Sequence, residues 1–190
     1  MITPDTAPGW AEFPIPGGAA PVPIVQLRFD PASRAQTLFV RFPAGWSRPV
    51  SGFYEAAEEF VVISGTLRMS GATYEPGDWG YVPAGSVRTA TDVLGECLVF
   101  ARFDGPARWR EAAEAAGPAP MTAPLSGEPR ELRRGDGSIV RYGPVEAGVP
   151  AAGDTEVLDL ARAAYAFVAA GSPLPPVDGA CFVRVFGGDA

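Results

Sequence analysis

The sequence predicts a mainly all-β protein, a β-barrel or β-sandwich with a short α-helix and a strand-rich C-terminal segment. Short apolar runs alternate with Pro, Gly, Ser and Asp turn signals through the first half of the chain, a spacing typical of such folds. The pattern then becomes rich in Ala, Glu and Arg. The predicted strands cover residues 24–29, 36–42, 60–63, 66–69, 79–82 and 96–103.

A helix is predicted where the strand pattern stops. Asp104 can cap its start, Pro106 suits its first turn, and residues 108–116 are good helix formers that end at Gly117. We therefore expect four parts: an irregular N-terminal arm at 1–22, a barrel at 23–104, a helix and linker at 105–130, and a partial repeat at 131–190.

The partial repeat is predicted from two echoes within the chain. Residues 79–86 (WGYVPAGS) resemble residues 165–172 (YAFVAAGS), and residues 97–99 (CLV) resemble 181–183 (CFV). Chance similarity in an Ala-, Val- and Gly-rich chain is the alternative. We interpret the segment as a degenerate half-barrel that packs against the first barrel, although residues 158–170 favour a helix by propensity alone.

The composition excludes several function classes. A net charge of −7 argues against nucleic-acid binding. The chain has no His and all fifteen basic residues are Arg, so a Ser-His-Asp triad, an imidazole base and a Schiff-base lysine are all absent. Two cysteines are too few for a disulfide scaffold, and no apolar stretch is long enough to cross a bilayer. We expect a cytoplasmic protein with no membrane partner.

Two spaced sets of residues carry a family resemblance. In the first, Gly45 is followed by Ser51, Phe53, Glu58 and Gly65 at the intervals of the pattern G-x5-H-x-H-x3–4-E-x6-G. Ser51 and Phe53 stand at the two histidine positions.

The second set follows the pattern G-x5-P-x-G-x2-H-x3-N. Gly77, Pro83 and Gly85 match it, while Arg88 stands at the histidine position and Asp92 at the asparagine position. Together the two sets resemble the cupin superfamily. The resemblance implies a cupin-type β-barrel, or jelly roll, that opens at one end to a ligand pocket and forms a homodimer.

The departures from the pattern determine the expected chemistry. In the family, three His and one Glu hold a divalent metal, and here three of those positions read Ser51, Phe53 and Arg88. Phe cannot coordinate a metal, and a guanidinium repels one. We expect no metal and no other cofactor.

The resemblance places Glu58 and Arg88 inside the barrel. Glu58 is the candidate general acid/base, and Arg88 would bind an anionic or carbonyl oxygen; the alternative is a structural ion pair. Tyr54 and Tyr81 are candidate catalytic phenols that could equally be packing residues. Arg41, Trp46, Arg48, Ser51, Phe53 and Asp92 are the candidate substrate-binding residues.

These residues predict a metal-independent enzyme that performs non-redox acid/base chemistry. Isomerisation, cyclisation or dehydration of a small oxygenated metabolite fits a pocket with few polar groups, and a biosynthetic role is compatible with it. A non-catalytic module that binds or senses a small molecule is the alternative. A third hypothesis is a structural repeat used for dimerisation, whose pocket would be filled by aromatic side chains.

Overall fold

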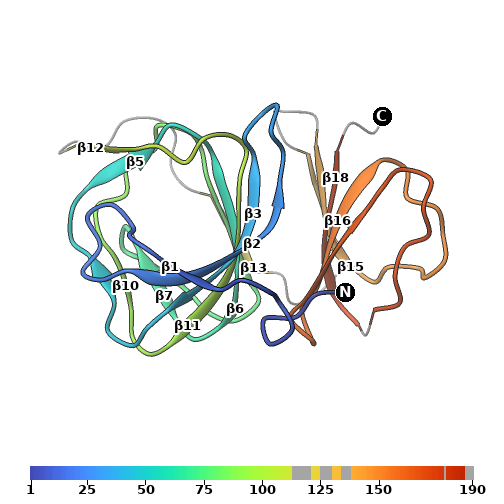
Figure 1. Cartoon of the computed structure of the whole chain (residues 1–190), viewed down its shortest axis with the longest axis horizontal. Helices are drawn as coiled ribbons and strands as arrows, with labels where there is room; N and C mark the ends of the chain where they lie inside the picture. The colour runs from blue at the N-terminus through green and yellow to red at the C-terminus, as the bar shows by residue number, and fades with distance from the viewer. Residues whose placement is uncertain (113–120, 125–129, 134–137, 178, 187–190) are drawn as a thin grey trace. The chain divides into compact units, whose positions relative to one another are not determined.

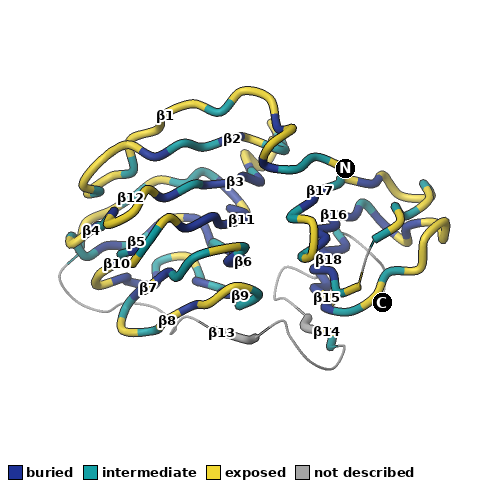
Figure 2. The backbone as a smooth tube through the Cα atoms, turned by 90° about the horizontal axis from the view of Figure 1, so that it is seen from below, coloured by how far each residue is buried: buried dark blue, intermediate teal, exposed yellow. Residues whose placement is uncertain are grey.

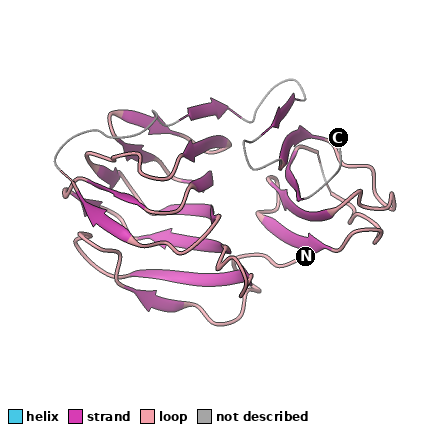
Figure 3. Cartoon of the chain, turned by 90° about the horizontal axis from the view of Figure 1, so that it is seen from above, coloured by secondary structure: helices cyan, strands magenta, loops and turns pink. Residues whose placement is uncertain are grey.

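The computed structural model describes residues 1–112, 121–124, 130–133, 138–177 and 179–186. In these residues every regular element is a β-strand and there is no helix that could cross a membrane (Figure 3). The chain divides into two compact units, one of residues Pro8–Pro124 and one that combines Met1–Ala7 with Leu125–Ala190 (Figure 1). The all-β prediction is confirmed.

The larger unit is a barrel of antiparallel strands. Its main sheet has seven strands in the order β1-β2-β3-β11-β6-β9-β13, and two smaller sheets have the orders β4-β10-β7-β8 and β12-β5. The strands are β1 (Ala11–Phe13), β2 (Val22–Phe29), β3 (Gln36–Phe42), β4 (Ser47–Arg48), β5 (Gly52–Tyr54), β6 (Glu58–Ser64), β7 (Leu67–Met69), β8 (Ala72–Tyr74), β9 (Asp78–Val82), β10 (Thr91–Val93), β11 (Cys97–Phe103), β12 (Trp109–Glu111) and β13 (Met121–Pro124).

Strand alternation determines which side chains enter the barrel. On β3, Leu38, Val40 and Phe42 belong to the barrel core, whereas the intervening Phe39 and Arg41 point to the opposite face of the sheet. Figure 2 shows that the central strands β11 and β6 are buried along most of their length. On β3, the apolar side chain of every second residue therefore contributes to the barrel core.

The predicted helix at 108–116 is wrong for the part that the structure describes. Residues Trp109–Glu111 form strand β12, which pairs with β5, and residues 113–116 lie outside the described residues. Asp104 caps no helix here; its Oδ1 accepts a hydrogen bond of 2.8 Å from the Ala57 N–H. Strand pairing and burial of the Trp109 ring against Tyr54 override the helix propensity of the segment.

The N-terminal arm is more ordered than predicted. Within residues 1–22, β1 pairs with the start of β2, with Phe13 opposite Val22. Gly9 and Gly17 flank this segment and both have a left-handed φ, +81° and +72°, which glycine adopts without strain. The two glycines allow the chain to turn before and after β1.

The second unit contains one five-stranded antiparallel sheet in the order β14-β15-β18-β16-β17. Ranked by position in the sequence, this order is first, second, fifth, third, fourth, the same as that of β2-β3-β11-β6-β9 in the barrel. The strands are β14 (Arg130–Arg133), β15 (Ile139–Gly143), β16 (Asp154–Asp159), β17 (Ala164–Val168) and β18 (Cys181–Phe186).

Local details of the two sheets also match. Ser86 N–H donates to Pro83 O at 3.1 Å in the turn after β9, and Ser172 N–H donates to Ala169 O at 3.0 Å in the turn after β17. The strand-rich C-terminal partial repeat is therefore confirmed: its sheet, named the half-barrel here, has the same strand order as five strands of the main barrel sheet. That it packs against the barrel, and that the parts divide at residues 22, 104 and 130, stay predictions.

The repeat keeps a buried hydrogen bond between equivalent residues. Trp79 Nε1 donates to Glu59 Oε1 at 2.6 Å in the barrel, and the Tyr165 hydroxyl donates to Glu156 Oε1 at 3.0 Å in the half-barrel. Glu59 and Glu156 occupy equivalent positions in the two sheets. Glu58, which precedes Glu59, therefore corresponds to Thr155, which precedes Glu156. The half-barrel therefore carries Thr155 where the barrel carries its interior carboxylate.

Candidate active site

The barrel encloses a cavity of ≈ 370 Å³. This volume lies within the range of about 300–1,000 Å³ that is usual for small-molecule sites. Most of its lining is aliphatic or aromatic, and among the described lining residues only Arg48, Glu58 and Arg88 are charged. The apolar lining includes Ile15, Ile24, Leu38, Val40, Phe42, Trp46, Phe60, Leu67, Met69, Val99 and Phe103.

The three charged side chains form one cluster with Tyr54. Arg88 Nη1 makes an ion pair with Glu58 Oε2, and the Arg88 guanidinium carbon lies 4.8 Å from the Tyr54 ring centroid. Arg48 Nη1 donates to the Tyr54 hydroxyl at 3.4 Å. Two cations and one anion therefore meet in an interior that is otherwise apolar, which gives the cluster a net charge of +1.

Different parts of the barrel position the cluster. Arg88 follows the Gly85 turn and exchanges two backbone hydrogen bonds with Gly52, two residues before Tyr54 on β5. Glu58 begins β6, where its backbone lies opposite Val82 and Phe103. Arg48 ends β4 opposite Thr91 of β10, and its Nη2 donates to Thr91 Oγ1 at 3.2 Å.

Burial changes the protonation equilibria of two members. It raises the pKa of the Tyr54 phenol above its usual value, against an opposing effect of Arg48, so Tyr54 remains a hydrogen-bond donor at neutral pH. Burial also lowers the pKa of Arg48, and Tyr54 opposes this shift. An arginine nevertheless keeps its charge at neutral pH.

The structure brings together five of the ten predicted site residues. Tyr54, Glu58, Arg88, Trp46 and Arg48 all line the cavity. Trp46 does so as a packing residue, since its indole N–H donates to Ala20 O at 2.8 Å and its ring lies 4.7 Å from that of Phe42.

The other five predicted residues do not line the cavity. Ser51 Oγ donates to Thr89 O at 2.9 Å, and Asp92 makes an ion pair of 2.6 Å with Arg68. The side chains of the other three lie on the faces of their strands that point away from the cavity or core. Each neighbours a residue that faces inward: Phe53 precedes Tyr54, Arg41 follows Val40, and Tyr81 precedes Val82.

Sequence reasoning missed two groups of residues at the site. Thr91 and Trp109 hold Arg48, whose guanidinium carbon lies 4.0 Å from the Trp109 ring centroid. The arm supplies a second group of lining residues: Gly9, Ala11, Phe13, Pro14, Ile15 and Pro16. No sequence motif identifies either group. Trp109 follows the predicted barrel closely in the sequence, but the helix propensity of its segment led us to assign it to a helix.

Comparison with known proteins agrees with this geometry. The model of the ChrR Cupin-like domain matches residues 4–107, more than half of the chain. The chain belongs to this cupin family. The cupin resemblance of the two motifs is thereby confirmed, and no curated protein matches the chain.

Solved structures show the same cupin fold. A "putative dioxygenase" from Nostoc punctiforme is 18% identical with a TM-score of 0.73, and the match covers 97% of this chain and 80% of that one. Protein Ylba from E. coli is 18% identical with a TM-score of 0.53, covering 100% and 91%. An oxalate decarboxylase is 14% identical with a TM-score of 0.52, covering 97% and 76%. At these identities the likeness is one of fold.

The cupin metal does not fit the residues present here. Of the four ligand positions only Glu58 offers a metal donor inside the barrel, and its Oε2 is in contact with the Arg88 guanidinium. Among the described residues no group of three or more His, Cys, Asp or Glu side chains could hold a metal ion. Arg88, which stands at a histidine position of the ligand pattern, therefore brings a positive charge into contact with Glu58.

Proposed function

We propose that this cupin is a metal-independent enzyme that transfers protons on a small oxygenated metabolite. The contact between Glu58 and Arg88 inside an apolar cavity is the observation that carries the proposal. It combines a carboxylate that can accept a proton with a cation that can stabilise the negative charge formed on the substrate.

The proposed reaction moves a proton between two carbons of a substrate that contains a carbonyl group. Glu58 accepts a proton from the carbon next to the carbonyl, and the electron pair moves onto the carbonyl oxygen. Arg88 donates hydrogen bonds to that oxygen and stabilises the enolate. Glu58 then donates the proton to a second carbon conjugated with the enolate, which gives isomerisation. Alternatively, Glu58 donates it to a hydroxyl group on the carbon next to the deprotonated one, and the hydroxyl leaves as water, which gives dehydration.

Tyr54 fits the role of a neutral hydrogen-bond donor in this scheme. Its hydroxyl already accepts a hydrogen bond from Arg48, and burial raises its pKa, so the phenol keeps its own proton for an oxygen of the ligand. A donor that is held in place before the reaction needs no reorganisation when charge develops on the substrate.

The names of similar proteins point to other chemistry. The Nostoc punctiforme protein is described as a dioxygenase and another relative is an oxalate decarboxylase. We do not extend oxygen or decarboxylation chemistry to this chain, because the donor set around Glu58 departs from the metal-binding pattern.

Non-catalytic ligand binding is the second candidate function. The observation that favours it is the ion pair itself, because the Glu58 carboxylate that would accept a proton is already in contact with the Arg88 guanidinium. A binding module would use the same cavity and the same cations without any proton transfer.

Deuterium exchange tests the proposed chemistry without knowledge of the natural substrate. The full chain, purified without a metal-binding tag, is incubated in D2O with small ketones and keto acids, and incorporation of deuterium next to the carbonyl is followed by NMR. We expect exchange that persists after treatment with a metal chelator and falls at least about 100-fold in Glu58→Gln, within the range of general acid/base catalysis.

The matched control is Glu55→Gln, which removes an arginine-paired carboxylate at the surface, where Glu55 Oε1 lies 2.7 Å from Arg110 Nε. This variant should exchange at the wild-type rate, and the melting temperature of each variant reports whether it is folded. Exchange that needs a bound metal, or that is unaffected in Glu58→Gln, contradicts the proposal. Ligand binding without any exchange favours the binding module.

A further inference from the structure

Arg48 is a buried cation whose hydrogen-bond partners and ring contacts are all neutral. Its relative exposure is 3%. Its hydrogen bonds go to the Tyr54 hydroxyl at 3.4 Å and to Thr91 Oγ1 at 3.2 Å, and its guanidinium lies over the rings of Trp109 and Tyr54. Arg88, by contrast, has the carboxylate of Glu58 as its counter-ion.

A buried charge without a counter-ion is expensive, because neutral partners replace only part of its hydration. The second positive charge of the cluster is therefore left for an anion to neutralise. Two of the five guanidinium N–H groups of Arg48 donate to protein side chains, and its buried Nε–H has no partner among the described residues.

The surroundings hold the Arg48 guanidinium in one orientation. Its carbon lies 4.0 Å from the Trp109 ring centroid, and its two terminal nitrogens donate to Tyr54 and Thr91, so contacts with three side chains restrict its movement. A planar, pre-oriented guanidinium binds both oxygens of a carboxylate through two parallel hydrogen bonds. The rest of the cavity offers aliphatic and aromatic contacts for an apolar body.

We infer that Arg48 is the anchor for the carboxylate group of an apolar monocarboxylate. One negative charge neutralises the net +1 of the cluster, whereas a dicarboxylate would place an unpaired second charge against the apolar lining. This inference rests on the cavity of the proposed function, and it adds the substrate class; proton transfer by Glu58 is a separate claim.

The test measures binding of carboxylates and of their neutral analogues by calorimetry. The probes are straight-chain acids from butanoate to decanoate, together with benzoate, and the matching primary amides. We expect at least one acid to bind at least tenfold more tightly than its amide, about 1.4 kcal/mol. If no acid binds at millimolar concentration, or if acids and amides bind equally, the inference is wrong.

Substitutions at Arg48 test whether this residue causes the preference for an acid over its amide. Arg48→Gln should abolish it, and Arg48→Lys, which keeps the charge and loses the planar fork, should retain part of it. Arg68→Gln is the matched control, because Arg68 lies on β7 between two cavity-lining residues but is exposed and paired with Asp92. A preference that survives in Arg48→Gln overturns the assignment.

Failure of this inference is distinct from failure of the proposed function. Carboxylate binding that depends on Arg48, without deuterium exchange, supports the anchor and leaves a binding module. Exchange on neutral ketones by a protein that shows no preference for acids supports the chemistry and overturns the anchor. Should Arg48→Gln fail to fold, the Arg48→Lys variant and the acid–amide comparison on the wild-type protein still decide the question.

Discussion

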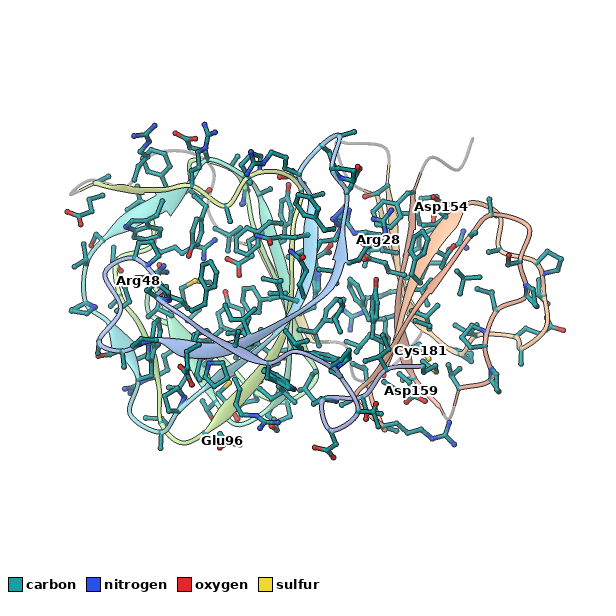
Figure 4. All side chains as sticks on the ribbon, in the orientation of Figure 1. Arg28, Arg48, Glu96, Asp154, Asp159 and Cys181 are labelled. Atoms are coloured by element: carbon teal, nitrogen blue, oxygen red, sulfur yellow. The ribbon has the colours of Figure 1, made fainter. Side chains whose placement is uncertain are left out.

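The guanidinium carbon of Arg48 lies 4.0 Å from the ring centroid of Trp109. This contact joins a two-residue strand, β4, to the strand β12 that replaces the predicted helix. Trp109 also meets the Tyr54 ring edge-on at a centroid distance of 5.1 Å, so one indole supports two members of the cluster. Figure 4 shows Arg48 within the ring of barrel strands.

Replacing Trp109 should therefore cost both stability and ligand binding. Trp109→Phe keeps an aromatic face for Arg48, and we expect it to lower the free energy of unfolding by about 1 kcal/mol. Trp109→Leu removes the cation–π contact and the edge-on packing together, and we expect a loss of about 2–4 kcal/mol. Urea unfolding measures both values. Equal losses in the two variants would show that the aromatic face is unimportant.

The Glu58–Arg88 pair should behave as a coupled unit. Its side chains are 13% and 5% exposed, and removal of one partner from a buried pair leaves an uncompensated charge, which costs about 3–5 kcal/mol. We expect the double variant Glu58→Gln/Arg88→Met to be more stable than Glu58→Gln alone. A double-mutant cycle by chemical unfolding checks this coupling. Simple additivity of the two single changes would contradict it.

Gly80 has no side chain, and this leaves room for the ring of Phe60, which lines the cavity. It lies opposite Phe60 in the pairing of β6 and β9, and a Cβ at position 80 would collide with the Phe60 ring. Gly80→Ala should destabilise the protein by about 1–3 kcal/mol through overpacking and should weaken ligand binding. Gly95→Ala is the control, since a Cβ at position 95 would meet no other part of the chain within 4 Å and the φ of Gly95 is not left-handed. Melting temperatures that fall equally in both variants would refute the steric argument.

The two cysteines should make the protein sensitive to alkaline pH. Burial raises the pKa of Cys97 and of Cys181 to about 12, with smaller contributions from Glu75 and Asp159 respectively. The ordinary thiol pKa is about 8.5, so the unfolded chain releases these protons first as pH rises. The stability that depends on protonated thiols is complete below about pH 8.5 and is lost as pH rises to about 12, by up to about 1.4 kcal/mol per pH unit for each thiol.

Chemical unfolding of wild type and Cys97→Ala between pH 8 and 11 measures this effect as the difference between the two curves. We expect the variant to lose stability less steeply. Figure 4 labels Cys181 beside Asp159, which lies opposite it in the pairing of β16 and β18. Cys181→Ala should therefore show the same behaviour, and parallel curves for wild type and both variants would contradict the prediction.

The segment 9–16 should be the most mobile wall of the cavity. β1 makes only a three-residue pairing with β2, and glycines with a left-handed φ stand at both ends of the segment. We expect the amides of residues 11–13 to exchange with solvent faster than those of β6 and β11, and a bound carboxylate to slow them. Hydrogen exchange followed by mass spectrometry tests this order. Exchange of β1 as slow as that of the central strands would show a rigid wall.

Local sequence signals determined the barrel and its partial copy. Turn residues such as Gly85 and Gly171 need a left-handed φ, which glycine provides, and the matching turns after β9 and β17 follow from the matching sequences. Apolar alternation marks strands for the same local reason. Composition alone likewise rules out the usual cupin ligand set, because a chain without histidine has no imidazole to offer a metal.

The tertiary structure decided which polar side chains meet. The cupin resemblance led us to expect Glu58 and Arg88 inside the barrel, and both line its cavity. Strand register put Arg41 and Tyr81 on outer faces, and Asp92 pairs with Arg68. Trp109 lies in a strand, where its ring packs on Tyr54 and Arg48, because such tertiary contacts override helix propensities, which differ by less than about 1 kcal/mol per residue. Side-chain burial between distant segments is a property of the folded chain, and it makes Arg48 a buried cation that an anion can neutralise.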